Sequence, residues 1–236
     1  MCTHRALTAP LVAIALVLAD FVATAPAGTQ HSRDRLWTLI QSCLVPGGNH
    51  NTDTCQAPRA DGIGNLDPRC MTTTQVWAQS QQYVAIRDER MCNCPAGFVH
   101  GLAIPFARIS GIEADNLPEG IWKFAWDAAR GQIADAAAIA LVVSPPLQRT
   151  QDQLHIHLVR RRAGACATFP ADALVSTTSL NHIWRIVQRR AKRGHFTNYS
   201  VLVTKCAKDR FTVVVEEVPK GSRKTPEGQY TEHDCR

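Results

Sequence analysis

Alternating polar and apolar residues predict one unusual strand in this chain. Along residues 148–159 polar and aliphatic side chains take turns. Because successive side chains of a strand point to opposite faces, Gln153, His155 and His157 would share one face. The opposite face would carry three aliphatic residues, Leu154, Ile156 and Leu158. The pattern predicts a strand with a core side and a side that bears two imidazoles and an amide.

The rest of the pattern predicts a mixture of helices and strands. Helical spacing of apolar residues occurs at 33–43, 121–132, 171–176 and 182–192. Strands are predicted at 82–87, 98–109, 138–143, 199–204 and 211–218, the last two as a hairpin. Residues 45–75 are rich in turn-forming residues and predict irregular structure. Neighbouring strands and segregated helices favour a single α+β domain on an antiparallel sheet.

The N-terminus predicts export. A weakly basic start precedes an apolar run at 11–19 and small residues at 23–27. The run is shorter than the roughly 20 residues that a membrane-spanning helix needs. We therefore expect residues 1–27 to be a signal peptide cleaved after Ala27. An uncleaved N-terminal membrane anchor stays open if residues 21–23 extend the run past Asp20.

Cysteine usage agrees with an oxidising compartment. Of nine cysteines, eight lie beyond the signal, an even number that favours disulfides in an exported chain. Cys43 and Cys55 enclose a polar loop and are the candidate local pair. Cys92 and Cys94 could suggest a zinc knuckle, but one knuckle cannot supply four ligands. The terminal Cys235 could be tied back by a disulfide.

Charge narrows the class of partner. The formal net charge is +6 and the isoelectric point is about 9.0, which favours anionic ligands or an anionic membrane surface. The basic residues gather at 160–162 and 185–193, without an aromatic RNA-binding motif or finger spacing. The sequence therefore does not indicate a nucleic-acid-binding protein.

Three interpretations of the histidine strand are open on the residues alone: a solvated face, a pair of metal ligands, or catalysis. Arg149 and Thr150 lie just upstream and offer a guanidinium and a hydroxyl suited to phosphate oxygens. No carboxylate stands on the histidine side of the strand, so we expect no metal and no other cofactor. His100 precedes an apolar strand and could lie near the pocket, although a structural role is the simpler interpretation.

Three stretches together resemble one known family. They are FVHGLAIP at 98–105, GIWKFAW at 120–126 and ALVVSPPLQRTQDQLHIH at 140–157. They are similar to bacterial CDP-diacylglycerol pyrophosphatases, a membrane-associated branch of the histidine-triad (HIT-like) superfamily. The resemblance covers about residues 33–235, which we expect to form the catalytic domain. It implies a HIT-like antiparallel sheet and a phosphoric-anhydride hydrolase that works without a metal or cofactor.

The resemblance also implies a substrate and roles for residues. CDP-diacylglycerol would be cleaved to CMP and phosphatidate at a membrane surface, on the periplasmic face of the inner membrane. In the superfamily motif His-φ-His-φ-His the middle histidine is the nucleophile, so His155 would form a nucleotidyl-histidine and His157 would assist. Gln153 replaces the first histidine and can hydrogen-bond but cannot shuttle a proton. The resemblance assigns substrate binding to Ser144, Arg149, Thr150 and Gln153.

Two other functions are compatible with the residues. The chain could be a HIT-like hydrolase or transferase acting on another nucleotide. It could also be a non-enzymatic, disulfide-rich secreted binding protein whose histidines are incidental. Export and positive charge favour the lipid-linked substrate, because soluble nucleotide pools are cytosolic.

Overall fold

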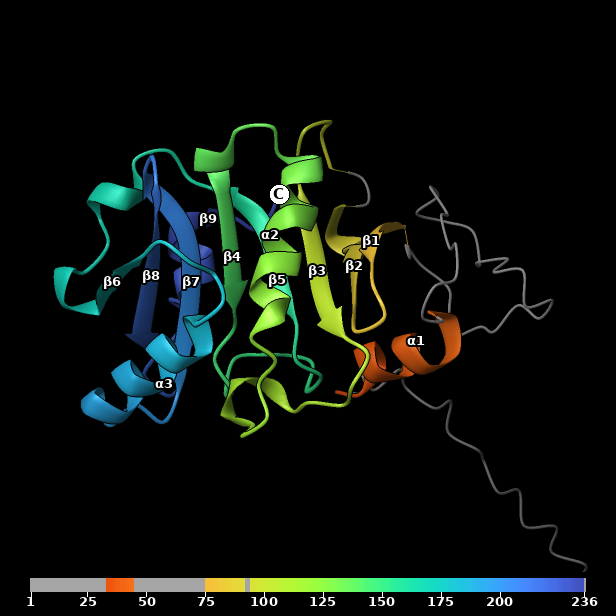
Figure 1. Ribbon diagram of the computed structural model, residues 1–236, viewed down its shortest axis with the longest axis horizontal. Coiled ribbons are helices and arrows are strands. Elements are labelled where there is room, and N and C mark those ends of the chain that lie inside the picture. Colours follow the sequence, from red (N-terminus) through yellow and green to blue (C-terminus); the bar gives the residue numbers. More distant parts are fainter. Residues whose placement is uncertain (1–32, 45–74, 92–93, 236) are drawn as a thin grey trace, which may run out of the picture. The chain divides into compact units, whose positions relative to one another are not determined.

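One antiparallel sheet organises the chain (Figure 1). The computed structural model describes residues 33–44, 75–91 and 94–235. In that part nine strands form the order β1-β2-β3-β5-β4-β7-β8-β6, and β9 pairs with β5. The strands are β1 (Val76–Gln79), β2 (Tyr83–Arg87), β3 (His100–Pro105), β4 (Ile139–Val143), β5 (Ile156–Arg161), β6 (Leu174–Thr177), β7 (Tyr199–Ala207), β8 (Arg210–Glu217) and β9 (Thr231–Glu232).

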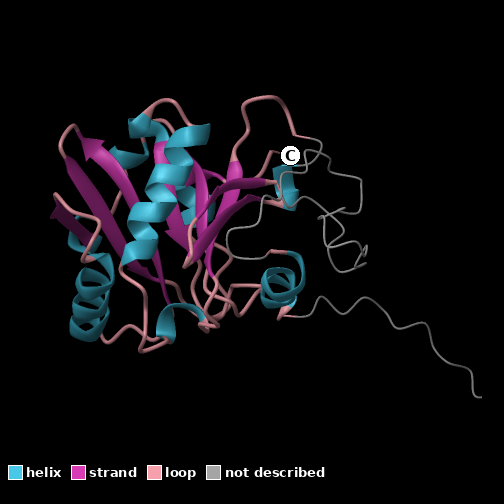
Figure 2. Cartoon of the chain, turned by 45° about the vertical axis from the view of Figure 1, so that its right-hand side comes forward, coloured by secondary structure: helices cyan, strands magenta, loops and turns pink. Residues whose placement is uncertain are grey.

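The described residues form fewer α-helices than strands. The α-helices of the described residues are α1 (Arg35–Cys43), α2 (Gly120–Gln132), α3 (Ile183–Gly194) and α4 (Pro226–Tyr230). Short 3₁₀ turns lie at Glu89–Met91, Gly111–Glu113, Ala136–Ala138, Ala165–Ala167 and Ala171–Ala173. Figure 2 shows α2 lying across one face of the sheet.

One face of the sheet holds the main core. The apolar sides of α2 and α3 pack there against inward side chains of the strands. Trp122 of α2 and Trp184 of α3 are fully buried, with ring centroids 4.8 Å apart. Leu154, Ile156 and Leu158 belong to the same cluster, as their alternation predicts. The aliphatic side of the histidine segment therefore anchors it to the core.

On the opposite face of the sheet, the buried apolar residues form two separate clusters. One apolar cluster joins α1 to β2 and β3, with Ile40 and Ile104 among its members. Another joins β4, β5 and β7 to Phe169 and Tyr230. His157 lies on this face, since it is paired in register with Leu102 of the first cluster and Val142 of the second. A polar strip is therefore enclosed between two apolar clusters.

Antiparallel pairing brings several loops to one end of the sheet. Strands β3, β4 and β8 end there, and β5 and β7 begin there. The Asn198 side chain links three of these loops, because its amide nitrogen donates to Gln148 Oε1 (2.9 Å) and to the Val218 carbonyl (2.6 Å). Its oxygen accepts the backbone N–H of Leu147 at 2.9 Å. The loop positions are thus fixed relative to one another.

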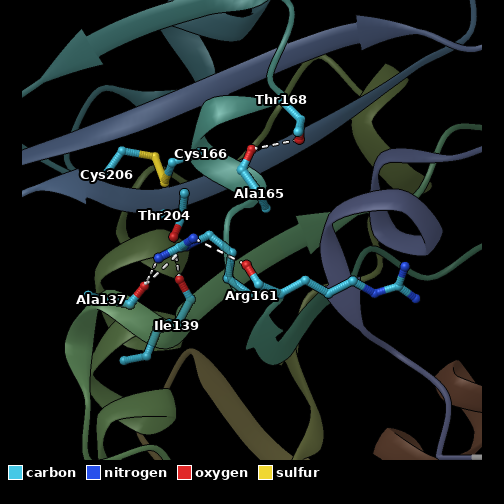
Figure 3. Close-up of a disulfide and its surroundings, with 9 residues drawn as sticks. Ala137, Ile139, Arg161, Ala165, Cys166, Thr168, Thr204 and Cys206 are labelled. Atoms are coloured by element: carbon cyan, nitrogen blue, oxygen red, sulfur yellow. Dashed lines mark hydrogen bonds between the residues drawn. A yellow bond between two sulfur atoms is a disulfide. The ribbon is translucent and has the colours of Figure 1, made fainter.

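Two disulfides join described residues. Cys166 and Cys206 connect the turn after β5 to β7, near the Arg161 guanidinium that donates to the Ala137 carbonyl (Figure 3). Cys94 and Cys235 connect the segment before β3 to the C-terminal segment. The prediction that Cys235 is tied back is confirmed, and Cys94 is a disulfide partner rather than a zinc ligand. Cys55 and the Cys43 side chain lie outside the described residues.

Most predicted elements are confirmed, with two corrections. The histidine strand begins only at Ile156, because residues 148–155 are held by loop contacts and a single bridge between Ser110 and Gln153. The helix predicted at 171–176 is a 3₁₀ turn followed by β6, which pairs with β8. Strand β1, α4 and β9 were not predicted. The signal and the irregular segment fall outside the described residues, apart from Gln75.

No helix among the described residues combines the length and apolar character needed to cross a membrane.

Removing the Cys166–Cys206 disulfide tests its contribution to stability. The bond closes a loop between residues 40 positions apart, so the double variant Cys166→Ala/Cys206→Ala should lose about 2–4 kcal/mol of unfolding free energy. Urea unfolding without reductant measures this loss. An unchanged midpoint would show that this disulfide does not constrain the unfolded chain.

Candidate active site

Pairing of β3 with β5 brings two distant histidines together. His100 and His157 are diagonal neighbours on one face of these strands, and His100 Nε2 lies 2.9 Å from His157 Nδ1. Their exposed fractions are 0% and 5%. His155, just before β5, places its ring centroid 4.9 Å from that of His157. The structure therefore gathers three imidazoles where the sequence pattern indicated two.

Backbone contacts determine the tautomer of His155. Its Nδ1 lies 2.7 Å from the carbonyl oxygen of Gln153. A carbonyl only accepts hydrogen bonds, so Nδ1 carries the proton and Nε2 of the neutral ring keeps its lone pair. No described residue hydrogen-bonds to that Nε2. His155 therefore presents an unprotonated nitrogen suited to nucleophilic attack.

The same argument orients the other two rings. His100 Nδ1 lies 3.0 Å from the His233 carbonyl oxygen and must donate to it. In a neutral pair His100 Nε2 then accepts the proton of His157 Nδ1, which leaves the lone pair of His157 on Nε2. Their 2.9 Å contact also needs one lone pair, so the two rings share at most one extra proton. The pair can take up a single proton at its His157 end.

Two carboxylates complete the cluster, which corrects the expectation that none lies on the histidine face. Glu227 Oε1 of α4 is 3.3 Å from His157 Nδ1 and 3.8 Å from His100 Nε2. Asp88 Oδ2 is 3.8 Å from His100 Nε2. Both come from outside the histidine segment. Neither could be placed by strand alternation, because tertiary contacts alone bring β2 and α4 to this face.

Local sequence explains how Glu227 is presented. The Thr225 side chain accepts the N–H of Gly228 as an N-cap, and Pro226 occupies the first turn of α4. At the other end, the Thr231 hydroxyl donates to the Glu227 carbonyl at 2.6 Å. This one-turn helix holds the carboxylate over the sheet with 7% of the residue exposed.

Asp88, His100 and His157 also offer three metal-ligand atoms that lie within 4.8 Å of one another. Two nitrogens that share a tetrahedral zinc ion at about 2.0–2.1 Å would stand about 3.3 Å apart. The 2.9 Å separation of His100 and His157 is instead the length of a hydrogen bond. The geometry favours a hydrogen-bonded histidine pair, and a metal would require the rings to separate.

The Ser144 hydroxyl lies between the His157 ring and the Glu227 carboxylate. Its Oγ is 3.4 Å from His157 Nε2 and 3.2 Å from Glu227 Oε2. The hydroxyl has one proton, so it donates to His157 when that nitrogen is unprotonated. When His157 Nε2 carries a proton, its N–H donates to the hydroxyl oxygen, and the hydroxyl donates to Glu227. Ser144 thus couples the histidine pair to the carboxylate.

Gln153 is turned toward the neighbouring loop. Its amide nitrogen donates to the carbonyls of Pro105 (3.1 Å) and Ala107 (2.8 Å), and its oxygen accepts the Ile109 N–H at 3.3 Å. The residue is 2% exposed. These contacts hold the segment whose carbonyl orients His155. The predicted contact between Gln153 and substrate has no test in the structure and stays a prediction.

Arg149 and Thr150 lie on the loop that leads to His155. Two nitrogens of the Arg149 guanidinium donate to the two carboxylate oxygens of Glu113. Gly111 has a φ of +67° and a Cβ there would overlap the guanidinium, so glycine permits this packing. Thr150 is exposed. Arg149 is close enough for its charge to lower the pKa of His155.

Burial keeps the imidazoles neutral. It lowers the pKa of His155, against the opposing hydrogen bond to Gln153 and the charges of Glu227 and Asp88. Burial lowers the pKa of His157 well below its ordinary value, and repulsion by the charge that neighbouring groups carry when protonated, His155 first, lowers it further. Burial also lowers the pKa of His100, although both carboxylates oppose it. Near neutral pH the lone pairs are therefore available.

Sequence reasoning found part of this site. His155, His157 and Ser144 come together as expected, and His100, first assigned the simpler structural role, contacts His157 directly. Asp88 and Glu227 were missed. The Thr225-Pro226 start of α4 was an available helix signal, but nothing local indicates which surface that helix covers.

A comparison with known families identifies a match to most of the chain. A family model described as CDP-diacylglycerol pyrophosphatase matches residues 31–231. Among curated proteins, no match was found.

Buried neutral histidines predict a pH-dependent stability. In the unfolded chain each titrates near pH 6.5, whereas in the fold its pKa is lower, so unfolding takes up protons as the pH falls below about 6.5. Stability should fall by about 1.4 kcal/mol per pH unit for each such histidine between its folded and unfolded pKa values. Urea unfolding at several pH values from 7.5 to 5.0 measures this slope.

The variant His155→Asn isolates one histidine, since asparagine does not titrate. Its slope should be smaller by about 1.4 kcal/mol per pH unit in the same window. His182→Asn, at an exposed position, is the matched control and should leave the slope unchanged. Equal slopes in the His155 variant and the wild type would contradict the assignment of a neutral His155.

Proposed function

The chain belongs to the CDP-diacylglycerol pyrophosphatase family and is an enzyme, and we propose that it hydrolyses its lipid substrate through a covalent nucleotidyl intermediate on His155. The products would be CMP and phosphatidate. One observation carries the mechanism: the Gln153 carbonyl holds the proton of His155 on Nδ1, so Nε2 has a free lone pair. The same bond would stabilise the positive charge that the ring gains when Nε2 bonds to phosphorus.

The first step exchanges one bond for another. The lone pair of His155 Nε2 attacks the phosphorus next to cytidine, and an N–P bond forms. The bond from that phosphorus to the bridging oxygen breaks, and phosphatidate leaves with the electron pair. A phosphate monoester is a good leaving group, so this step needs little proton donation. The hydrogen-bonding groups beside it, Ser144 and His157, would stabilise charge on the departing oxygen.

The second step regenerates the enzyme. Water attacks the phosphorus of the intermediate, and the lone pair of His157 Nε2 accepts its proton while the Ser144 hydroxyl turns to Glu227. The N–P bond breaks, and CMP leaves while His155 recovers its neutral form. The extra proton is shared by His157 and His100 beside Glu227 and Asp88, whose negative charges favour its presence. It then passes to solvent.

Other predicted contacts fit this scheme as proposals. The Thr150 hydroxyl and the Arg149 guanidinium are placed on the loop before His155, where phosphate oxygens would approach. Part of the hydrogen-bonding capacity of Arg149 is already used by Glu113, so its contribution would be mainly that of its charge. Gln153 would act by holding the backbone that orients His155.

We also propose the HIT-like assignment and the location. The HIT-like assignment is supported by two histidines at alternate positions beside an antiparallel strand and by the backbone-fixed tautomer of the first. A lipid-linked substrate supports action at a membrane surface. Export to the periplasmic face of the inner membrane rests on the N-terminal sequence and the disulfides.

Labelled substrate tests the covalent mechanism. With CDP-diacylglycerol carrying ³²P next to cytidine, quenched wild-type enzyme should retain label that survives alkali and is released by acid, as expected of a phosphoramidate. Hydrolysis in H₂¹⁸O should place the heavy oxygen in CMP. His155→Ala should lose about 10⁴-fold in kcat/KM and all protein-bound label.

Controls separate the parts of this proposal. His182→Ala should keep full activity, because that side chain is exposed and has no role in the site. EDTA should leave the rate unchanged, and a loss with chelator alone would support a metal at Asp88, His100 and His157. Unchanged activity in His155→Ala would refute the nucleophile. Inactivity of the wild type on CDP-diacylglycerol would refute the substrate.

The Cys94–Cys235 disulfide should matter for activity. It holds the C-terminal segment whose His233 carbonyl orients His100. Cys94→Ala/Cys235→Ala should therefore lower kcat/KM by about tenfold or more at a temperature where the variant is folded. Cys166→Ala/Cys206→Ala is the matched control, which should lose stability but keep kcat/KM. Equal activity of the two double variants would mean that the disulfide does not position the site.

A further inference from the structure

Two loops connect the site to the surface within three residues. The first runs from Ser144, beside His157, to Leu147. The second runs from Lys224 to Glu227, whose carboxylate contacts the same histidine. Since three residues span at most about 10–11 Å, both surface positions lie close to the chemistry. We call the surface formed by Leu147, Lys220, Arg223 and Lys224 the basic rim.

Leu147 is an unusual surface residue. It is 59% exposed, whereas the other exposed large apolar side chain of the described residues, Leu174, is 37% exposed. Its position is not loose, because its backbone N–H donates to the Asn198 side chain at 2.9 Å. The fold therefore holds an aliphatic side chain in water at a defined place.

The loop next to Leu147 carries three cationic side chains. Lys220, Arg223 and Lys224 are all exposed, and none forms an ion pair with another described residue. Gln148, next to Leu147, donates through its amide to the carbonyls of Pro219 (3.4 Å) and Ser222 (3.5 Å). These bonds tie the apolar loop to the basic loop. The nearest exposed carboxylate along the second loop is Glu217, at the end of β8.

We propose that the basic rim docks the enzyme on an anionic phospholipid bilayer, with Leu147 inserted among the acyl chains. An exposed aliphatic side chain on a loop that is hydrogen-bonded to a loop with three exposed cations matches the boundary between headgroups and hydrocarbon. This inference rests on the proposed function for its purpose, since docking here would bring the site to the headgroup of a membrane-held substrate. The docking itself does not require that the enzyme be active.

The basic face of α3 is the competing surface. Arg189, Lys192 and Arg193 line an open pocket of about 610 Å³ with Val175 and Ile186. However, α3 packs on β8 and covers the face opposite the histidines. Docking through α3 would not present the site to the lipid. Three cations can be neutralised on each surface, so variants of equal charge can be compared.

Vesicle binding tests the electrostatic part. Full-length protein is mixed with phosphatidylcholine vesicles containing 30% phosphatidylglycerol, or none, and the bound fraction is measured by flotation. The triple variant Lys220→Gln/Arg223→Gln/Lys224→Gln should weaken binding to the anionic vesicles by roughly 100-fold. Each single substitution should weaken it by at most about tenfold. Arg189→Gln/Lys192→Gln/Arg193→Gln, with the same loss of charge, should weaken it far less.

Insertion is tested at Leu147 itself. In the variant Leu147→Trp, tryptophan emission should shift to shorter wavelength on anionic vesicles and be quenched by lipids brominated in their acyl chains. Leu174→Trp is the matched control and should show neither change. This readout reports the rim even if the N-terminal segment also binds membranes. Leu147→Ser should lower the rate on vesicle-held CDP-diacylglycerol about tenfold and leave the rate on short-chain substrate in detergent unchanged.

The outcomes separate the two proposals. Flotation and quenching use vesicles without CDP-diacylglycerol, so they can succeed even if the enzyme proves inactive on that lipid. Wild-type binding by the rim triple variant, or an unquenched tryptophan at position 147, would overturn the docking surface. Loss of binding confined to the α3 triple variant would assign membrane contact to α3 instead.

Discussion

The alternation of side chains along β5 is the constraint on which the rest of the structure depends. This strand is paired on both sides, so its register cannot slip without moving Ile156 and Leu158 out of the core. Leu154, Ile156 and Leu158 are fully buried beneath α2, and their burial holds the intervening histidines on the other face. Apolar packing on one side thus positions polar chemistry on the other, without a side-chain contact dedicated to that purpose.

Enclosure of this polar strip has a chemical consequence. Transfer of an imidazole from water disfavours its charged form, so burial between two apolar clusters keeps the lone pairs free. Glu227 and Asp88 oppose this effect at the His100–His157 pair, where the proposed second step places a proton. The tautomer of His155 is determined instead by the hydrogen bond from its Nδ1 to the Gln153 carbonyl oxygen. One buried strip therefore holds both the proposed nucleophile and a separate histidine pair that can take up a proton.

The C-terminal segment connects the site to its surroundings. It supplies the Glu227 carboxylate and the His233 carbonyl, and the Cys94–Cys235 disulfide fastens its end. The loop before α4 carries the cations of the basic rim. The parts of the molecule that tune the histidines and those that would meet a membrane are thus neighbours along one stretch of chain. That continuity keeps the proposed membrane contact close to the histidines.

Periodicity by itself determined much of this protein: the α+β class, the helices α1, α2 and α3, the β7–β8 hairpin, and the separation of His155 and His157 from the core side of their segment. These features depend on local spacing and on apolar burial, which a sequence displays directly. The tertiary structure alone decided that His100 contacts His157, that Asp88 and Glu227 join them, and that Gln153 bonds to the neighbouring loop. The contacts of Gln153 with Ala107, of His100 with His157 and of Ser144 with Glu227 join residues 46, 57 and 83 positions apart. The contacts of Glu227 also depend on which face a one-turn helix covers. No local pattern encodes such contacts, because they arise from strand order and from the path of the chain across the sheet.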